Sequence, residues 1–179
     1  MATTTRPAVP ADATDLHELA ARTFGLATPP GTLQTDIDAF IEEHLALSSF
    51  DKYLADPCRS LLLAEEGGAT IGYSMLVAGP IADPALACTV AAAGPGPAIE
   101  LSKFYVDADS HGSGVAAALM AATLAAAAAT EARHCWLGVN QRNARAVRFY
   151  TRHGFETIGT KRFLVGEFWH DDYVLARPL

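Results

Sequence analysis

The sequence predicts a single mixed α+β domain, and three observations support this fold class. The chain of 179 residues suits one domain of ordinary size. Half of the residues are hydrophobic and only 18% are charged, which excludes a disordered chain. Segments with helical periodicity alternate with short strand-like runs, and neither a repeat nor a domain boundary divides residues 1–179.

The N-terminal half is expected to begin with a short strand and to continue through helices. Apolar residues recur every three or four positions after Ala11 and again after Asp36, as on one face of a helix. Two strand-like runs then flank Gly67-Gly68, which is typical of a hairpin turn. The expected elements are a strand at 3–6, helices from 11 and from 35, a helical turn at 50–55, and strands at 60–64 and 70–77.

Residues 78–98 are predicted to form a loop insertion. This segment holds four of the ten prolines of the chain, together with several Gly and Ala residues. A loop near 20 residues is unusual inside a compact domain. We therefore expect an insertion or a partly mobile segment.

The C-terminal half alternates strands and helices. The expected elements are a strand at 99–106, a turn at 110–114, an Ala-rich helix at 115–130, a strand at 134–139, a helix at 143–153, and strands at 157–165 and 173–176. Gly154 stands where a left-handed residue ends a helix.

Composition and charge exclude several classes of protein. A formal charge of −7 argues against a protein that coats nucleic acid or an anionic membrane, because both require a basic surface. The first ten residues lack an apolar signal region, and the longest weakly polar run, 115–130, is shorter than the roughly 20 residues that span a bilayer. Three cysteines without ligand-like spacing indicate neither disulfides nor a metal site. We expect a cytoplasmic protein without metal.

The turn between the strand at 99–106 and the Ala-rich helix is suited to phosphate. Such a turn presents backbone N–H groups at a helix N-terminus, where the helix dipole favours negative charge. Gly112 and Gly114 allow a phosphate to approach the backbone, since they have no Cβ. The turn lacks the lysine of a P-loop and the third glycine of a dinucleotide-binding fingerprint. Its residues alone leave open a phosphate site or an ordinary strand-to-helix turn.

Two motifs resemble those of the GNAT acetyltransferases. The sequence HGSGVA at 111–116 resembles the acetyl-CoA pyrophosphate loop of that family, Gln/Arg-x-x-Gly-x-Gly/Ala. About thirty residues later, GVNQRNARAVRFYTRHGFETIG resembles the second signature of the family. The likeness implies a GNAT-like domain with a central, mostly antiparallel twisted sheet of six or seven strands and about four helices. His111 and Ser113 depart from the usual residues of the loop, which implies weaker cofactor binding.

The resemblance also implies the roles of individual residues. Tyr150 would donate a proton to the departing thiolate, and Glu100 would take a proton from the attacking amine. By its position alone, Glu100 could instead face solvent or pair with Lys103. The residues implied to bind acetyl-CoA, the co-substrate, are Phe104, Tyr105, Val106, His111, Gly112, Ser113, Gly114, Val115, Ala116, Asn143 and Tyr150.

The acceptor is implied only by one branch of the family. The closing stretch at 163–179 resembles the C-terminal strand pair of the branch that contains the bacterial spermidine/spermine acetyltransferases. This implies direct attack by a small primary amine or a polyamine in a ternary complex, and a homodimer formed through these strands. Asp171-Asp172 is interpreted as a solvated turn or a substrate-facing acidic pair. The alternatives are acetylation of a protein N-terminus or lysine, and a non-catalytic acyl-CoA-binding regulatory module.

Overall fold

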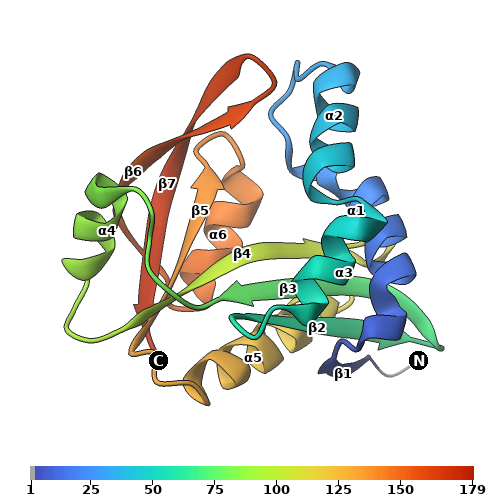
Figure 1. Ribbon diagram of the computed structural model, residues 1–179, viewed down its shortest axis with the longest axis horizontal. Coiled ribbons are helices and arrows are strands. Elements are labelled where there is room, and N and C mark those ends of the chain that lie inside the picture. Colours follow the sequence, from blue (N-terminus) through green and yellow to red (C-terminus); the bar gives the residue numbers. More distant parts are fainter. Residues whose placement is uncertain (1–2) are drawn as a thin grey trace.

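A single seven-stranded sheet forms the centre of the protein (Figure 1). The computed structural model describes residues 3–179. The strands run in the order β1-β2-β3-β4-β5-β7-β6, and every neighbouring pair is antiparallel except β4 and β5. Their bounds are β1 Thr4–Pro7, β2 Arg59–Glu66, β3 Ala69–Val77, β4 Ala98–Val106, β5 His134–Asn140, β6 Glu156–Val165 and β7 Phe168–Pro178. The predicted mostly antiparallel α+β fold is therefore confirmed.

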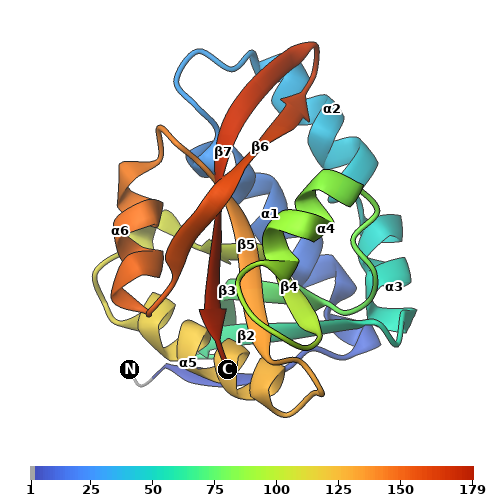
Figure 2. The same ribbon diagram turned by 90° about the vertical axis from the view of Figure 1, so that its left-hand side faces the viewer.

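Helices cover both faces of this sheet. One face carries α1 Ala13–Ala27, α2 Gln34–His44, α3 Leu47–Ala55 and α4 Pro84–Ala91, and the other carries α5 Val115–Ala128 and α6 Ala144–Arg152. Figure 2 shows α4 and α6 on opposite sides of the strands β5, β7 and β6. Two short 3-10 helices, η1 Pro10–Asp12 and η2 Ala108–Ser110, complete the helical elements of the described chain. The described residues form six α-helices where the resemblance implied about four.

Apolar residues at helical and strand spacing build the core between these layers. On one face, Leu16 and Leu19 of α1 and Phe50 of α3 are fully buried in one cluster with Leu63 and Met75 of the sheet. On the other face, the Ala-rich helix α5 contributes only a few large side chains to the core. Its buried hydrophobic residues are Val115, Leu119, Met120 and Ala127.

The segment 78–98 is partly helical, which corrects the prediction of a loop insertion. Helix α4 occupies its centre, with Asp83 as the N-cap and Pro84 in the first turn. The Asp83 carboxylate accepts hydrogen bonds from the N–H groups of Ala85 and Leu86 at 2.8 and 3.3 Å. Proline is favoured at the first helical position, because its missing N–H would have no partner there. The helix packs Val90 against Trp136 of β5, so it belongs to the core.

Strand β4 changes its partners along its length, and this creates an opening in the sheet. Its pairing with β3 shifts register between Met75 and Leu76, which leaves Ser102 without a paired residue. Its parallel pairing with β5 covers only 98–100 and ends where Glu100 lies beside Trp136. Beyond that point the backbone of β4 that faces β5 has no strand partner. The sheet is therefore split between β4 and β5 from residue 101 onward.

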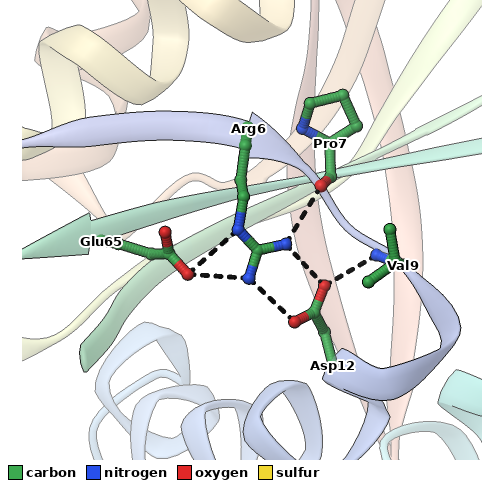
Figure 3. Close-up of polar contacts among 5 residues, drawn as sticks. All are labelled: Arg6, Pro7, Val9, Asp12 and Glu65. Atoms are coloured by element: carbon green, nitrogen blue, oxygen red, sulfur yellow. Dashed lines mark hydrogen bonds and ion pairs between the residues drawn. The ribbon is translucent and has the colours of Figure 1, made fainter. Parts of the chain in front are cut away.

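An ion-pair network anchors the first strand (Figure 3). The Arg6 guanidinium donates two hydrogen bonds to the carboxylate of Asp12, at 2.8 and 2.9 Å, and two more to Glu65 Oε1, at 2.7 and 3.1 Å. The N–H of Val9 also donates to Asp12 at 2.7 Å. The hydrogen bonds from Arg6 hold the pKa of the buried Asp12 carboxyl below its ordinary value. The network joins β1, η1 and β2.

Replacement of Arg6 by Met is expected to destabilise the fold by about 1–3 kcal/mol at neutral pH, since it leaves a buried carboxylate without its charged donor. The depressed pKa of Asp12 stabilises the protein above the ordinary Asp value and loses this effect as the pH falls through the folded-state pKa. Thermal unfolding should therefore separate R6M from wild type at pH 7 and bring the two together in acid. The exposed R142M variant is the control, and equal melting of R6M and wild type at pH 7 would contradict the prediction.

Candidate active site

The turn that follows β4 forms an anion-binding cradle. Gly112 and Gly114 have positive φ values of 83° and 92°, and a Cβ on either would meet open space. Among the described residues, no hydrogen-bond acceptor contacts the N–H groups of Gly112, Gly114 or 115–117. These donors lie at the N-terminus of α5, where the helix dipole adds positive potential. Such a cradle fits the pyrophosphate of a nucleotide cofactor.

A groove of about 520 Å³ connects this turn to α6, and we call it the turn groove. Helix α6 lines it with Arg145, Arg148 and Arg152, which recur at helical spacing on one side of the helix. The groove therefore combines backbone donors on one wall with guanidinium groups on the other. This charge distribution suits a ligand with several phosphates.

Arg145 approaches His111, one of the two residues at which the turn departs from the motif that it resembles. His111 Nε2 lies 3.1 Å from the carbonyl oxygen of Val106, so the ring donates there and its Nδ1 remains an acceptor. Arg145 Nη1 donates to this Nδ1 at 2.9 Å. The guanidinium thus stands over the phosphate turn, although it comes from a position 34 residues away in the sequence. Arg145 thus brings a cation to the position where the motif can have Arg and this sequence has His111.

Replacement of Arg145 by Ala is expected to raise the KM for acetyl-CoA about 10-fold and to leave kcat nearly unchanged. The reason is that a charge-assisted contact to a phosphate stabilises the bound cofactor equally in the ground state and in the transition state. Steady-state kinetics with acetyl-CoA as the varied substrate measure this. The control is R142A, because Arg142 is exposed just before α6 and does not line the turn groove. An equal KM for R145A and wild type would remove Arg145 from cofactor binding.

Tyr150 lies where the turn groove meets a second cavity. It lines both spaces, and its ring contacts those of Phe104 and Phe155 edge-on, with centroids 6.3 and 5.8 Å apart. Burial raises the pKa of the Tyr150 hydroxyl well above its ordinary value, and the neighbouring Tyr105 and Cys135 contribute to the shift. The hydroxyl therefore stays protonated at neutral pH. It can act as a proton donor at the split between β4 and β5.

The second cavity, which we call the sheet cavity, lies on the face of the sheet covered by α1 and α2. It has a volume of about 370 Å³, a size suited to a small molecule. Phe24 and Phe40 line it from the helices and stack on each other with ring centroids 4.4 Å apart. The opposite wall includes polar side chains that strand register places on one face of the sheet. They are Glu100 and Lys103 of β4, Asn140 of β5, Lys161 of β6, and His170 and Asp172 of β7.

Two carboxylates of this wall have raised pKa values. Burial raises the pKa of Glu100, while the charges of Lys161, Lys103 and Arg59 act in the opposite direction. Burial likewise raises the pKa of Asp172, which is only 6% exposed. A carboxylate whose pKa is raised toward neutrality is a better general base than an ordinary surface carboxylate.

A glycine gives Lys161 access to both carboxylates. A Cβ on Gly138 would collide with Cε of Lys161, so the lysine lies directly over the backbone of β5. From there its positive charge opposes the rise that burial causes in the pKa of Glu100 and of Asp172. The residue pairs Lys161–Asp172 and Asp172–Asn140 are neighbours in the register of β6, β7 and β5.

The structure brings most of the predicted site residues together. Glu100 and Tyr150 line the sheet cavity, and the residues lining the turn groove include Phe104, Tyr105, Val106, His111, Gly112, Gly114, Ala116, Asn143 and Tyr150. Asn143 also caps α6, because its side chain accepts a hydrogen bond from the N–H of Ala146 at 3.0 Å. Two predicted residues present no side chain to the groove. Val115 is buried in the core, and the Ser113 hydroxyl donates to the carbonyl of Ser110 within the turn at 2.7 Å.

Sequence reasoning did not identify Arg145, Lys161 or the aromatic wall as parts of the site. Of the predicted acidic pair, Asp172 faces the sheet cavity and Asp171 is exposed. The signal for this difference was the alternation of His170 and Asp172, which places both side chains on one face of a strand.

The three cysteines lie outside both spaces of the site. Cys58 and Cys88 are exposed and line neither space, whereas Cys135 is buried and burial raises its thiol pKa to about 12. In the part of the chain that the structure describes, no three His, Cys, Asp or Glu residues converge as a metal site. None of the helices in residues 3–179 has the length and apolar character needed to cross a bilayer.

Comparison with known proteins gives consistent matches. Residues 15–155 match the acetyltransferase (GNAT) family. An uncharacterised N-acetyltransferase of Mycobacterium tuberculosis (strain H37Rv) is 42% identical over 168 residues, which cover 94% of this chain and 98% of the relative. The crystal structure of the PaiA N-acetyltransferase of Thermoplasma acidophilum in complex with coenzyme A superimposes with a TM-score of 0.79 over the whole of both chains, at 17% identity. A GNAT acetyltransferase of Streptococcus pneumoniae gives a TM-score of 0.69 at 20% identity, covering 99% of this chain and all of the other.

Proposed function

The chain belongs to the GNAT acetyltransferase family, and we propose that it transfers the acetyl group of acetyl-CoA directly to the primary amine of a small molecule. The observation that carries the proposal is the split between β4 and β5. It connects the phosphate-binding turn groove to the sheet cavity, and Tyr150 lines both spaces. A cofactor bound through its phosphates at the turn can thus present its thioester to an acceptor on the other face of the sheet.

The residues of the turn groove fit acetyl-CoA. The unpaired N–H groups of the glycine turn suit the pyrophosphate, and the arginines of α6 suit the remaining phosphate charge. The CoA-bound state of the PaiA protein supports the same choice of co-substrate. Acetyl-CoA would supply a thioester, whose carbonyl carbon is attacked and whose acetyl group is transferred.

The residues at the split then manage the protons of the reaction. An alkyl amine with a pKa near 10 is almost fully protonated at neutral pH, so Glu100 takes a proton to free its lone pair. The nitrogen forms the new C–N bond as the C–S bond breaks, and Tyr150 donates a proton to the departing sulfur. The second proton that the nitrogen loses restores the Tyr150 hydroxyl. The products are the amide and free CoA, and one proton leaves to solvent. We infer that a backbone N–H of β4 near Tyr105 and Val106, beyond the end of the pairing with β5, polarises the carbonyl in the manner of an oxyanion hole.

A cationic amine fits the two carboxylates of the sheet cavity, Glu100 and Asp172. The polyamine implied by the sequence resemblance is one member of this class of acceptor, and it stays a prediction. A homodimer formed through the C-terminal strands likewise stays a prediction.

Two measurements test the proposed function. Calorimetric titration with acetyl-CoA should show binding, and its absence at millimolar protein and ligand would overturn the cofactor assignment. A thiol-release assay with small primary amines should then show CoA release that depends on the amine. Release with peptides alone would support a protein acetyltransferase, and binding without any turnover would support a non-catalytic acyl-CoA-binding module.

A further inference from the structure

The sheet cavity contains cations as well as carboxylates. Glu100 and Asp172 contribute two negative charges when ionised, and Lys103 and Lys161 contribute two positive charges. Lys161 acts on both carboxylates from its position over Gly138. The cavity therefore has no net negative charge that would select a polycation.

Lys103 is a cation of this wall that forms no direct ion pair with a described carboxylate, although the charge of Glu100 acts on it. Its Nζ lies 5.5 Å from the centroid of the Tyr53 ring, and no described carboxylate lies within 4.0 Å of it. Burial and the nearby Arg59 guanidinium lower the pKa of Lys103 to about 8, so the ammonium form still predominates at pH 7. A half-buried ammonium that lacks a counter-ion favours a ligand that brings one.

The position of Lys103 relative to Glu100 sets the spacing of the two ligand groups. Glu100 is registered with Val77 of β3, and Lys103 is registered with Met75, because the bulge at Ser102 adds one residue. Both side chains therefore lie on the same face, two partner residues apart, or roughly 7 Å along the strand. An amine at Glu100 and an anion at Lys103 would be separated by only a few bonds.

A second unsatisfied polar atom lies in the same cavity. His170 lines it, and its Nε2 is buried without a hydrogen-bond partner among the described residues. Buried polar atoms normally have a partner, so an unpaired atom on a residue that lines the cavity favours a polar ligand there. With the stacked rings of Phe24 and Phe40 on the opposite wall, the cavity offers both polar and apolar contacts.

We propose that the acceptor is a primary amine that also carries an anionic group such as a carboxylate, and that Lys103 binds this anion while the amine lies at Glu100. This inference rests on the proposed function and narrows its class of acceptor. A polyamine has only cationic groups, so it would place a like charge against Lys103. Lys103 is therefore a specificity-determining residue, and the transfer steps at Glu100 and Tyr150 are unchanged.

The test compares primary amines that are matched except for the presence of a carboxylate, which lies at the far end of the chain in the first set and on the carbon that bears the amine in the second. The first set is 4-aminobutyrate, butylamine and 1,4-diaminobutane, and the second is L-phenylalanine and phenethylamine, each assayed by CoA release. In at least one set, we expect kcat/KM for the carboxylate-bearing amine to exceed that of its matched amines by about 10-fold or more. The K103M variant should lose this preference, K103R should retain it, and K52M is the control, because Lys52 is exposed on α3.

A binding measurement keeps the test independent of turnover by the variants. Butyrate, which has the carboxylate but no amine, should inhibit wild type competitively against the acceptor and should inhibit K103M at least 10-fold more weakly. The inference is overturned if butylamine or 1,4-diaminobutane is acetylated as efficiently as 4-aminobutyrate and phenethylamine as efficiently as L-phenylalanine. The proposed function stands in that case. An unchanged preference in K103M would overturn it as well. Binding of acetyl-CoA with no amine acetylated would overturn the proposed function, and the inference with it.

Discussion

Replacement of Tyr150 by phenylalanine is expected to lower kcat by roughly 100-fold or more, which is within the range that general acid catalysis contributes. The ring packs among Phe104, Phe149 and Phe155, so phenylalanine retains the apolar contacts and removes only the hydroxyl. The KM for acetyl-CoA should change little, because its phosphates bind at the turn and not at this ring. Steady-state kinetics and calorimetric titration of Y150F against wild type measure the two effects separately.

The raised pKa of Tyr150 also determines how kcat should depend on pH. Because burial keeps the hydroxyl protonated throughout the neutral range, the wild-type profile of kcat against pH should show no loss of a proton donor between pH 6 and 9. The control is T151A, because Thr151 is the next residue of α6 and is exposed. Wild-type turnover in Y150F would remove Tyr150 from the mechanism.

Replacement of Glu100 by glutamine is expected to lower kcat/KM for the amine on the order of 100-fold. In wild type, activity should rise with pH as Glu100 loses its proton, and burial places this limb above the ordinary Glu pKa. The limb should be absent in E100Q, because glutamine does not titrate. The profile of kcat/KM against pH measures both effects.

Stability separates this catalytic role from a structural one. A carboxyl group whose pKa is raised in the folded state destabilises the fold as the pH rises above the ordinary pKa, since the unfolded chain releases the proton more readily. E100Q should therefore melt at a higher temperature than wild type at pH 7 and at a similar temperature near pH 4. The matched variant is D172N, which removes the other buried carboxylate of the sheet cavity. If D172N loses the rise of kcat/KM with pH and E100Q retains it, Asp172 is the general base instead of Glu100.

Local patterns allowed much of the fold to be predicted from the sequence. The strands at 60–64, 70–77 and 99–106 and the helix that begins at Val115 carry their own periodicity and turn residues, and each lies within a few residues of its predicted bounds. Helix α4 was missed because its proline resembles a helix breaker when the aspartate before it is not considered as a cap. Strand β7 extends well beyond the predicted 173–176, since the polar residues at 170–172 interrupt the apolar pattern, and His170 and Asp172 among them line the sheet cavity.

The site divides in the same way between local and distant contacts. The phosphate turn and Tyr150 belong to short motifs, so the sequence resemblance could identify them. Arg145 reaches His111 only because α6 packs beside the turn, and Lys161 reaches Glu100 only through strand pairing and the missing side chain of Gly138. Such contacts depend on tertiary structure, and no spacing in the sequence predicts them.

The two spaces of the site draw on different parts of the chain, and this has an evolutionary consequence. Apart from a few residues of α1, the turn groove is built from the continuous stretch 104–152. The sheet cavity adds the N-terminal segment 24–44 and the C-terminal positions 161–172. Mutations at the two ends of the chain can therefore change the acceptor while the machinery that binds and activates acetyl-CoA is inherited intact. New substrates are accessible to this protein without the loss of its cofactor.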